Sequence, residues 1–205
     1  MRKSRAALQR ALVQLIEIKS YDTITVEDVA GAADVARATF YAHYRDKAEL
    51  LQEVCGELIA DAAERAVGAA PGERTDTPMT YSGTAAAAIL RHAGEHAHLY
   101  RLVLTGAGGE GPRRQLIATL EAAVDSVYSG LAQALGRTPP IPMSVTVTAF
   151  TGALLAVIES WLDGQLGGTP EEVAATFMQG QVEGLAWSIG SSGEFRFVAP
   201  EASDQ

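Results

Sequence analysis

Residues 25–51 read TVEDVAGAADVARATFYAHYRDKAELL, and their spacing predicts two short helices joined by a tight turn. Thr25 followed by Asp28 resembles a capping box, in which a hydroxyl and an acid together close the first turn of a helix. That helix is expected to end at Ala33, and the next helix to span residues 36–44. With a helix before them and another after them, the two form a predicted helix-turn-helix unit.

The helix over residues 36–44 is too short to persist alone in water, because helix nucleation is costly, so its neighbours must hold it. Phe40 and Tyr44 lie four residues apart on one face and are expected to point inward. The outward face then carries hydrogen-bond donors and no carboxylate: Arg37, Thr39, Tyr41 and His43. A helix that enters the major groove of DNA needs such a face.

Lys47 lies in the first turn of the long helix predicted over residues 46–67. A cation there opposes the helix dipole, so the position is mildly unfavourable for stability. Beside a DNA phosphate, the lysine and the helix N-terminus would both become favourable. The alternative is that the Lys47 ammonium is simply hydrated.

Charge is distributed unevenly along the 205 residues, although the net charge of the chain is −9. Residues 1–50 carry eight basic and seven acidic side chains, so the excess of acid lies in the rest of the chain. This pattern favours contact of the N-terminal end with a polyanion. A hydrophobic content of 47% excludes a disordered chain, and the single cysteine, Cys55, excludes a disulfide framework and a cysteine-rich zinc site.

The remainder of the chain is predicted to be helical, which makes the whole protein all-α with about nine helices. Residues 69–83 have the composition of a loop. The other expected helices cover residues 4–19, 84–96, 98–105, 112–136, 142–163 and 170–188. The most apolar run, Val145 to Ile158, is shorter than the ~18 residues of a membrane-spanning helix, so we expect no membrane span and a cytoplasmic protein.

Residues 25–51 resemble the DNA-binding signature of the tetracycline-repressor (TetR) family of regulators, most specifically at residues 39–44, Lys47 and Leu50–Leu51. The resemblance covers about the first 65 residues. It departs from the family pattern at Asp34, where glycine is usual, and at Ala36, where serine or threonine caps the helix. Aspartate tolerates the left-handed backbone of such a turn, so the turn is expected to form.

The resemblance implies an N-terminal DNA-binding domain over residues 1–48, a helical effector-binding and dimerisation domain over 49–189, and a tail over 190–205. It also implies which side chains touch DNA. Contacts to the phosphate backbone are expected from Thr25, Thr39, Tyr41, His43 and Lys47. Contacts nearest the bases are expected from Arg37 and Ala38. An arginine there can pair with guanine.

Residues 142–163 are apolar or small on nearly every side, so something must cover the helix all round. Pairing of residues 142–163 and 170–188 with their two-fold copies would build a four-helix dimer interface. The alternative is a second layer of the same chain. The family resemblance favours the dimer.

A small-molecule site is also predicted. The candidate pocket residues are His92, His96, Tyr100, Tyr128, Phe150 and Trp161. We expect no enzyme activity, no metal and no cofactor, and we expect a repressor that a small molecule releases from a palindromic operator in double-stranded DNA. Two alternatives are a helical metal-dependent hydrolase that uses His92, Glu95 and His96, and a constitutive DNA-binding dimer without an effector.

Overall fold

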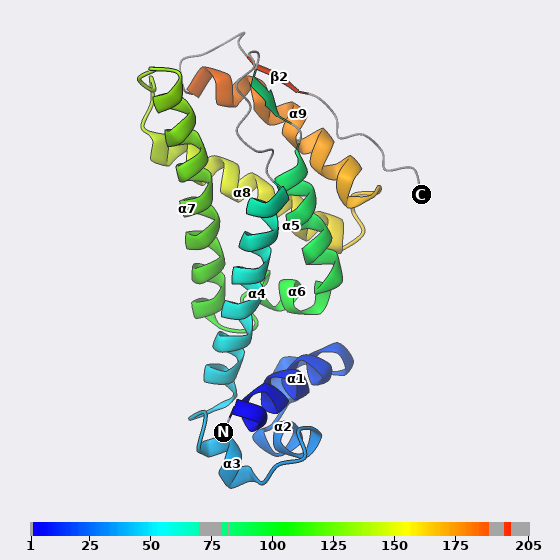
Figure 1. Cartoon of the computed structure of the whole chain (residues 1–205). Helices are drawn as coiled ribbons and strands as arrows, with labels where there is room; N and C mark the ends of the chain where they lie inside the picture. Colours follow the sequence, from blue (N-terminus) through cyan, green and yellow to red (C-terminus); the bar gives the residue numbers. More distant parts are fainter. Residues whose placement is uncertain (1, 70–78, 82, 189–194, 198–205) are drawn as a thin grey trace. The chain divides into compact units, whose positions relative to one another are not determined.

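The computed structural model describes residues 2–69, 79–81, 83–188 and 195–197, and it confirms the predicted all-α class (Figure 1). Within these residues there are nine α-helices and one short 3₁₀ helix, η1. The bounds are α1 Arg2–Ile18, η1 Tyr21–Thr23, α2 Val26–Ala32, α3 Arg37–Tyr41, α4 Lys47–Ala69, α5 Thr84–Glu95, α6 Ala97–Leu104, α7 Glu110–Ala134, α8 Met143–Leu162 and α9 Pro170–Ser188.

The chain forms two compact units. Unit 1 comprises residues 1–60 and 96–116, and unit 2 comprises residues 61–95 and 117–205. Helices α4 and α7 each contribute to both units. These units are defined by compactness, and the functional boundary after residue 48 stays a prediction.

A pair of short strands adds to the helices and was not predicted. Strand β1, Met79–Tyr81, pairs in parallel with β2, Phe195–Phe197, so the region expected to be a tail carries a strand. Strands of this length give too few residues for an alternating pattern to be recognised. The rest of the expected tail, and residues 70–78 and 82 of the expected loop, lie outside the described residues.

In unit 1, α1, α2 and α3 pack together around an apolar core. Its fully buried side chains come from α1, from the segment before α2, and from α2, α3 and α4: Leu8, Leu12, Ile24, Val29, Phe40, Leu50 and Leu51. Burial of a leucine or phenylalanine side chain contributes about 1.5–3 kcal/mol, so this core holds the short α3 in place. Helix α3 is shorter than predicted because the backbone N–H groups of His43 and Tyr44 both donate to the Phe40 carbonyl, which tightens the last turn.

The turn between α2 and α3 is a Schellman motif. The Val35 N–H donates to the Ala30 carbonyl at 3.0 Å, and the Asp34 N–H donates to the Gly31 carbonyl at 3.1 Å. Asp34 has a φ of 53°, in the left-handed region that glycine usually occupies. The turn at Asp34 forms as predicted.

We expect Asp34→Gly to stabilise the protein by about 1 kcal/mol, because glycine adopts the left-handed conformation without the steric strain of a Cβ atom. Thermal unfolding measures the change. The control is Asp22→Gly, at an exposed position of η1 where glycine relieves no such strain. A fall in the unfolding midpoint of Asp34→Gly would show that the aspartate side chain contributes more than its backbone costs.

Three helices begin at hydrogen-bonded caps, and the cap at Thr25 and Asp28 was predicted. Thr25 and Asp28 form the complete capping box of α2. The Glu49 N–H donates to Asp46 at the start of α4, at 2.9 Å. At the start of α9, the Thr169 N–H donates to Glu172 at 2.8 Å, and the Glu172 N–H donates back to the Thr169 hydroxyl at 3.2 Å. These bonds set where each helix begins.

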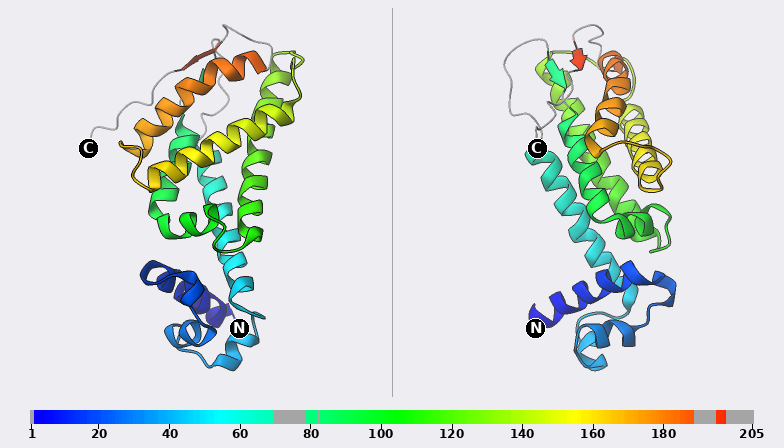
Figure 2. Two further views of the ribbon diagram at one scale, coloured as in Figure 1. Left: turned by 180° about the vertical axis from the view of Figure 1, so that it is seen from behind. Right: turned by 90° about the vertical axis from the view of Figure 1, so that its right-hand side faces the viewer.

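In unit 2, α9 packs along α5 and α8 (Figures 1 and 2). Helix α8 buries one stripe inside the chain: Val147, Thr151, Leu154 and Ile158. By length and composition α8 is long and apolar enough to cross a membrane, a test that a core helix of a soluble protein also passes. The helix exceeds the run from Val145 to Ile158 because it includes Glu159 and residues at both ends of the run, and the expected absence of a membrane span stays a prediction.

Candidate nucleic-acid interface

Helix α3 presents one buried side and one exposed side, as the sequence predicts. Phe40 is fully buried and Tyr44 is nearly so, and their ring centroids lie 5.8 Å apart. Arg37 and Tyr41 are exposed, together with the small Ala38 between them, while Thr39 and His43 are half-buried. The helix is therefore anchored from one side while its donors remain accessible on the other.

Arg37 is held by two neighbours on the exposed surface. Its Nη1 lies 2.5 Å from Oε1 of Glu27, which comes from the first turn of α2. Its Nη2 donates to the Tyr41 hydroxyl at 3.2 Å, and its guanidinium lies 5.4 Å from the centre of the Tyr41 ring. These contacts, the Tyr41 bond first and the Glu27 charge second, raise the pKa of Arg37. The guanidinium is thus oriented before any DNA arrives.

Two other predicted contact residues have partners within unit 1. The Thr25 hydroxyl accepts a bond from the Asp28 N–H and lies 2.8 Å from an Asp28 carboxylate oxygen. The His43 Nε2 lies 2.8 Å from the Ser4 hydroxyl of α1. Lys19, which bonds Asp28 at 2.8 Å, together with the capping bonds, holds the pKa of the Asp28 carboxyl well below its usual range. The start of α2 is therefore rigidly built.

Lys47 points back into its own unit. Its Nζ donates to three backbone carbonyls of the segment between α1 and α2: Tyr21 at 2.9 Å, Asp22 at 3.2 Å and Ile24 at 2.9 Å. It also lies 4.5 Å from the centre of the Tyr21 ring. An ammonium has three N–H donors, and here each has an acceptor. The phosphate contact implied for Lys47 stays a prediction. In the structure, this side chain holds the backbone of the segment between α1 and α2.

The basic N-terminus is helical rather than an extended arm from Arg2 onward. Arg5 makes a two-pronged ion pair with Glu53 of α4, in which Nε and Oε1 are 2.7 Å apart. The Arg5 guanidinium also lies 5.9 Å from the centre of the Tyr44 ring. Arg5 therefore links α1 to α4 next to Tyr44, the buried residue that follows α3.

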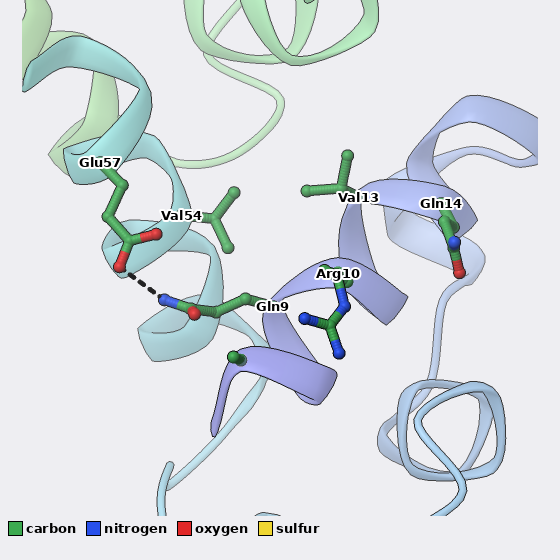
Figure 3. A pocket seen from close by; sticks show the side chains of 7 residues that line it. Gln9, Arg10, Val13, Gln14, Val54 and Glu57 are labelled. Carbon is green, nitrogen blue, oxygen red and sulfur yellow. Dashed lines mark hydrogen bonds between the residues drawn. The ribbon is translucent and has the colours of Figure 1, made fainter. Parts of the chain in front are cut away.

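A groove of about 410 Å³ lies between α1 and the first half of α4 (Figure 3). Its lining combines Val13 and Val54 with polar side chains, and the Gln9 amide donates to Glu57 across it at 2.8 Å. None of the predicted ligand residues lines this groove.

His92 is the most deeply placed of the ligand candidates. It is fully buried in α5, and its Nε2 lies 3.1 Å from Oδ2 of Asp61 in α4. Arg65 bonds the same carboxylate and, with His92, holds the pKa of Asp61 below its usual range. Glu95 is paired with Arg65 at 2.7 Å. The carboxylate that the hydrolase alternative needs is thus engaged by an arginine.

Of the aromatic candidates of unit 2, Tyr128 is buried, while Phe150 and Trp161 are half-buried and packed against neighbours. Tyr128 is buried, and its ring centroid lies 5.8 Å from that of Phe150, which in turn lies 5.3 Å from Phe177. Trp161 donates to the Gly168 carbonyl at 3.0 Å and lies against Gly94, where a Cβ atom would come within 2.9 Å of the ring. Packing of this kind is what aromatic residues at helical spacing usually provide.

His96 and Tyr100 belong to unit 1, whereas the other four ligand candidates belong to unit 2. His96 is the N-cap residue of α6, and Tyr100 is buried within that helix. The structure therefore brings Tyr128 and Phe150 together, and it places the six candidates in two units.

Glu27 is the residue at the surface that the sequence analysis did not find. No acid occurs on α3 itself, and Glu27 comes from the first turn of α2. Local sequence signals do not reveal this pair, because it depends on how α2 packs against α3.

Comparisons with known proteins agree with this geometry. Residues 8–54 match the family model of "Bacterial regulatory proteins, tetR family". Over 62 residues the chain is 40% identical to YxbF of Bacillus subtilis (strain 168), an uncharacterised HTH-type transcriptional regulator. That match covers 28% of this chain and 16% of the length of YxbF.

Solved structures resemble a larger share of the chain. A protein of Syntrophomonas wolfei assigned to the TetR family has a TM-score of 0.68 at 14% identity, covering 86% of this chain and 92% of that one. A TetR-family transcription regulator of Marinobacter aquaeolei VT8 has a TM-score of 0.60 at 18% identity, covering 92% and 95%. Likeness at these identities shows a shared fold. The tetR-family match is thus established for the helices over residues 8–54, and the chain as a whole shares the fold of these structures.

Proposed function

We propose that the protein is a sequence-specific DNA-binding regulator of transcription that acts in the cytoplasm. The observation that carries this proposal is the exposed face of α3, where Arg37 and Tyr41 present donors while Phe40 anchors the helix from behind. A helix held this way can enter a major groove without losing its support. The family match over residues 8–54 supports the same function.

In this proposal α3 lies in the major groove of double-stranded DNA. Arg37 and Ala38 are closest to the base edges, and Thr39, Tyr41 and His43 contact the phosphates on either side. Thr25, the N-cap residue of α2, is the proposed phosphate contact from that helix.

The test of this function is selection of bound sequences from random double-stranded DNA by the full chain. We expect an enriched palindromic site and an affinity that falls steeply with salt, by about 0.9 in the logarithmic slope for each phosphate contacted. Recovery of no enriched sequence, or binding independent of salt, would contradict the proposal.

We also propose a homodimer formed through α8 and α9. Helix α8 is strongly apolar, yet most of its residues are not buried within one chain. Val145, for example, is 57% exposed. A second copy would bury this face and would set two α3 helices at a fixed spacing, as a palindromic operator requires.

We expect Val145→Glu to raise the dimer dissociation constant at least tenfold, because a buried unpaired charge is costly at an interface. Sedimentation over a concentration series measures the change. Val67→Glu on α4, where the valine is 74% exposed, is the matched control. An unchanged dimer in Val145→Glu would place the interface elsewhere.

We propose further that a small molecule in unit 2 weakens operator binding. Buried polar groups within this unit support a polar ligand: His92 is fully buried, and the Thr151 hydroxyl of α8 is buried with no hydrogen-bond partner among the described residues. Helix α4 contributes residues to both units, so a shift of this helix would reach the DNA-binding helices. Repeating the selection with candidate ligands tests this step, and binding that no ligand changes would favour the constitutive dimer.

A further inference from the structure

The exposed ion pair between Glu27 and Arg37 places a carboxylate at the base-reading position of the proposed interface. Both side chains are more than half exposed, at 56% for Glu27 and 61% for Arg37. The pair joins α2 to α3 and is continued by the bond from Arg37 to the Tyr41 hydroxyl. Any DNA group that binds Arg37 must therefore compete with Glu27.

Two kinds of DNA group can compete for Arg37, and they differ in charge. A phosphate carries a full negative charge, so it is repelled by the Glu27 carboxylate as it approaches the shared guanidinium. The major-groove edge of guanine is uncharged and offers two acceptors in the spacing of an arginine fork. Glu27 therefore penalises a phosphate more strongly than a guanine.

We propose that Glu27 is a specificity-determining residue, which keeps Arg37 from binding phosphates and so reserves it for a guanine edge. This inference rests on the proposed function in DNA binding. The pair is not a stability device, because an exposed ion pair contributes little to folding. Its effect is expected on the ratio between specific and non-specific DNA binding.

The experiment compares full-length wild type, Glu27→Gln, Arg37→Ala and the double variant on two duplexes, one with the selected site and one of the same composition without it. Glutamine keeps the size of Glu27 and removes its charge. Glu17→Gln is the matched control. Glu17 is exposed on α1 in the same unit, and this substitution removes one negative charge that is not paired with Arg37. Thermal unfolding confirms that each variant is folded at the temperature of the binding assay.

We expect Glu27→Gln to bind the duplex without the site about three- to tenfold more tightly, because Arg37 becomes free to contact a phosphate. The salt slope on that duplex should steepen by about 0.9, the value of one added phosphate contact. Affinity for the selected site should change less than twofold, so the specificity ratio falls. Glu17→Gln should change the affinity for both duplexes by the same factor. In the Arg37→Ala background, Glu27→Gln should also change both affinities by the same factor.

An unchanged specificity ratio in Glu27→Gln would overturn the inference, and so would an equal fall of the ratio in the Arg37→Ala background. Failure of the proposed function is distinguishable, because wild type would then show no preference for any duplex.

Discussion

Arg37→Ala is expected to lose about 10- to 100-fold of the discrimination between the selected operator and the same duplex with its arginine-contacted guanine replaced. The physical reason is the loss of a bidentate arginine–guanine contact, which contributes about 1–3 kcal/mol of discrimination. The arginine is exposed on α3 and is already oriented by Glu27 and Tyr41. Its side chain therefore loses little conformational freedom when it binds DNA. Equilibrium titration of both duplexes measures the ratio.

Arg10→Ala is the control for this experiment, because Arg10 is an exposed arginine of α1 in the same unit. Arg10→Ala removes the same charge, so any loss of affinity should be equal for the two duplexes. Equal losses on both duplexes for Arg37→Ala would show that Arg37 contacts the backbone and reads no base.

Lys47→Met is expected to destabilise the protein by about 2 kcal/mol, because hydrogen bonds to a charged group contribute about 1.5–3 kcal/mol and three carbonyls lose their donor together. For a chain of this size, that change lowers the unfolding midpoint by about 4–8 °C. Methionine keeps most of the alkyl chain and removes the ammonium, so the loss reports the three carbonyl bonds together with the contact of the ammonium with the Tyr21 ring. Thermal unfolding measures the shift.

The same variant decides how Lys47 serves DNA binding. With all three donors directed at carbonyls between α1 and α2, Lys47 positions the start of α2 and has no donor left for a phosphate. We expect Lys47→Met to weaken all duplexes alike at a temperature where it is folded, with an unchanged salt slope. Lys3→Met, at an exposed lysine of α1, is the control. A slope flatter by about 0.9 with an unchanged unfolding midpoint would instead establish the phosphate contact that the family resemblance implies.

Local signals in the sequence predicted the fold well. The caps at Thr25, Asp46 and Thr169 each depend on residues three positions apart, so the chain itself brings the partners together. The left-handed turn at Asp34 was also predictable from a local signal, because aspartate is one of the few residue types that tolerate that backbone conformation. The inward positions of Phe40 and Tyr44 followed from their spacing of four.

Contacts between distant segments were beyond local reasoning. Lys47 reaches carbonyls more than twenty residues earlier in the chain, and backbone carbonyls leave no mark in a sequence pattern. The Glu27–Arg37 pair depends on how α2 packs against α3. For Tyr128 and Phe150, helical spacing indicates an inward direction but does not separate a packed core from a pocket wall.

The most direct measurement of the central claim is methylation interference at guanine N7 across the selected operator. N7 lies in the major groove and is one of the two acceptors that an arginine fork uses. We predict that methylation of one guanine in each half-site blocks wild type and leaves the residual binding of Arg37→Ala unaffected. If no guanine methylation interferes with wild type, or if it interferes equally with Arg37→Ala, Arg37 on α3 does not read DNA through the major groove.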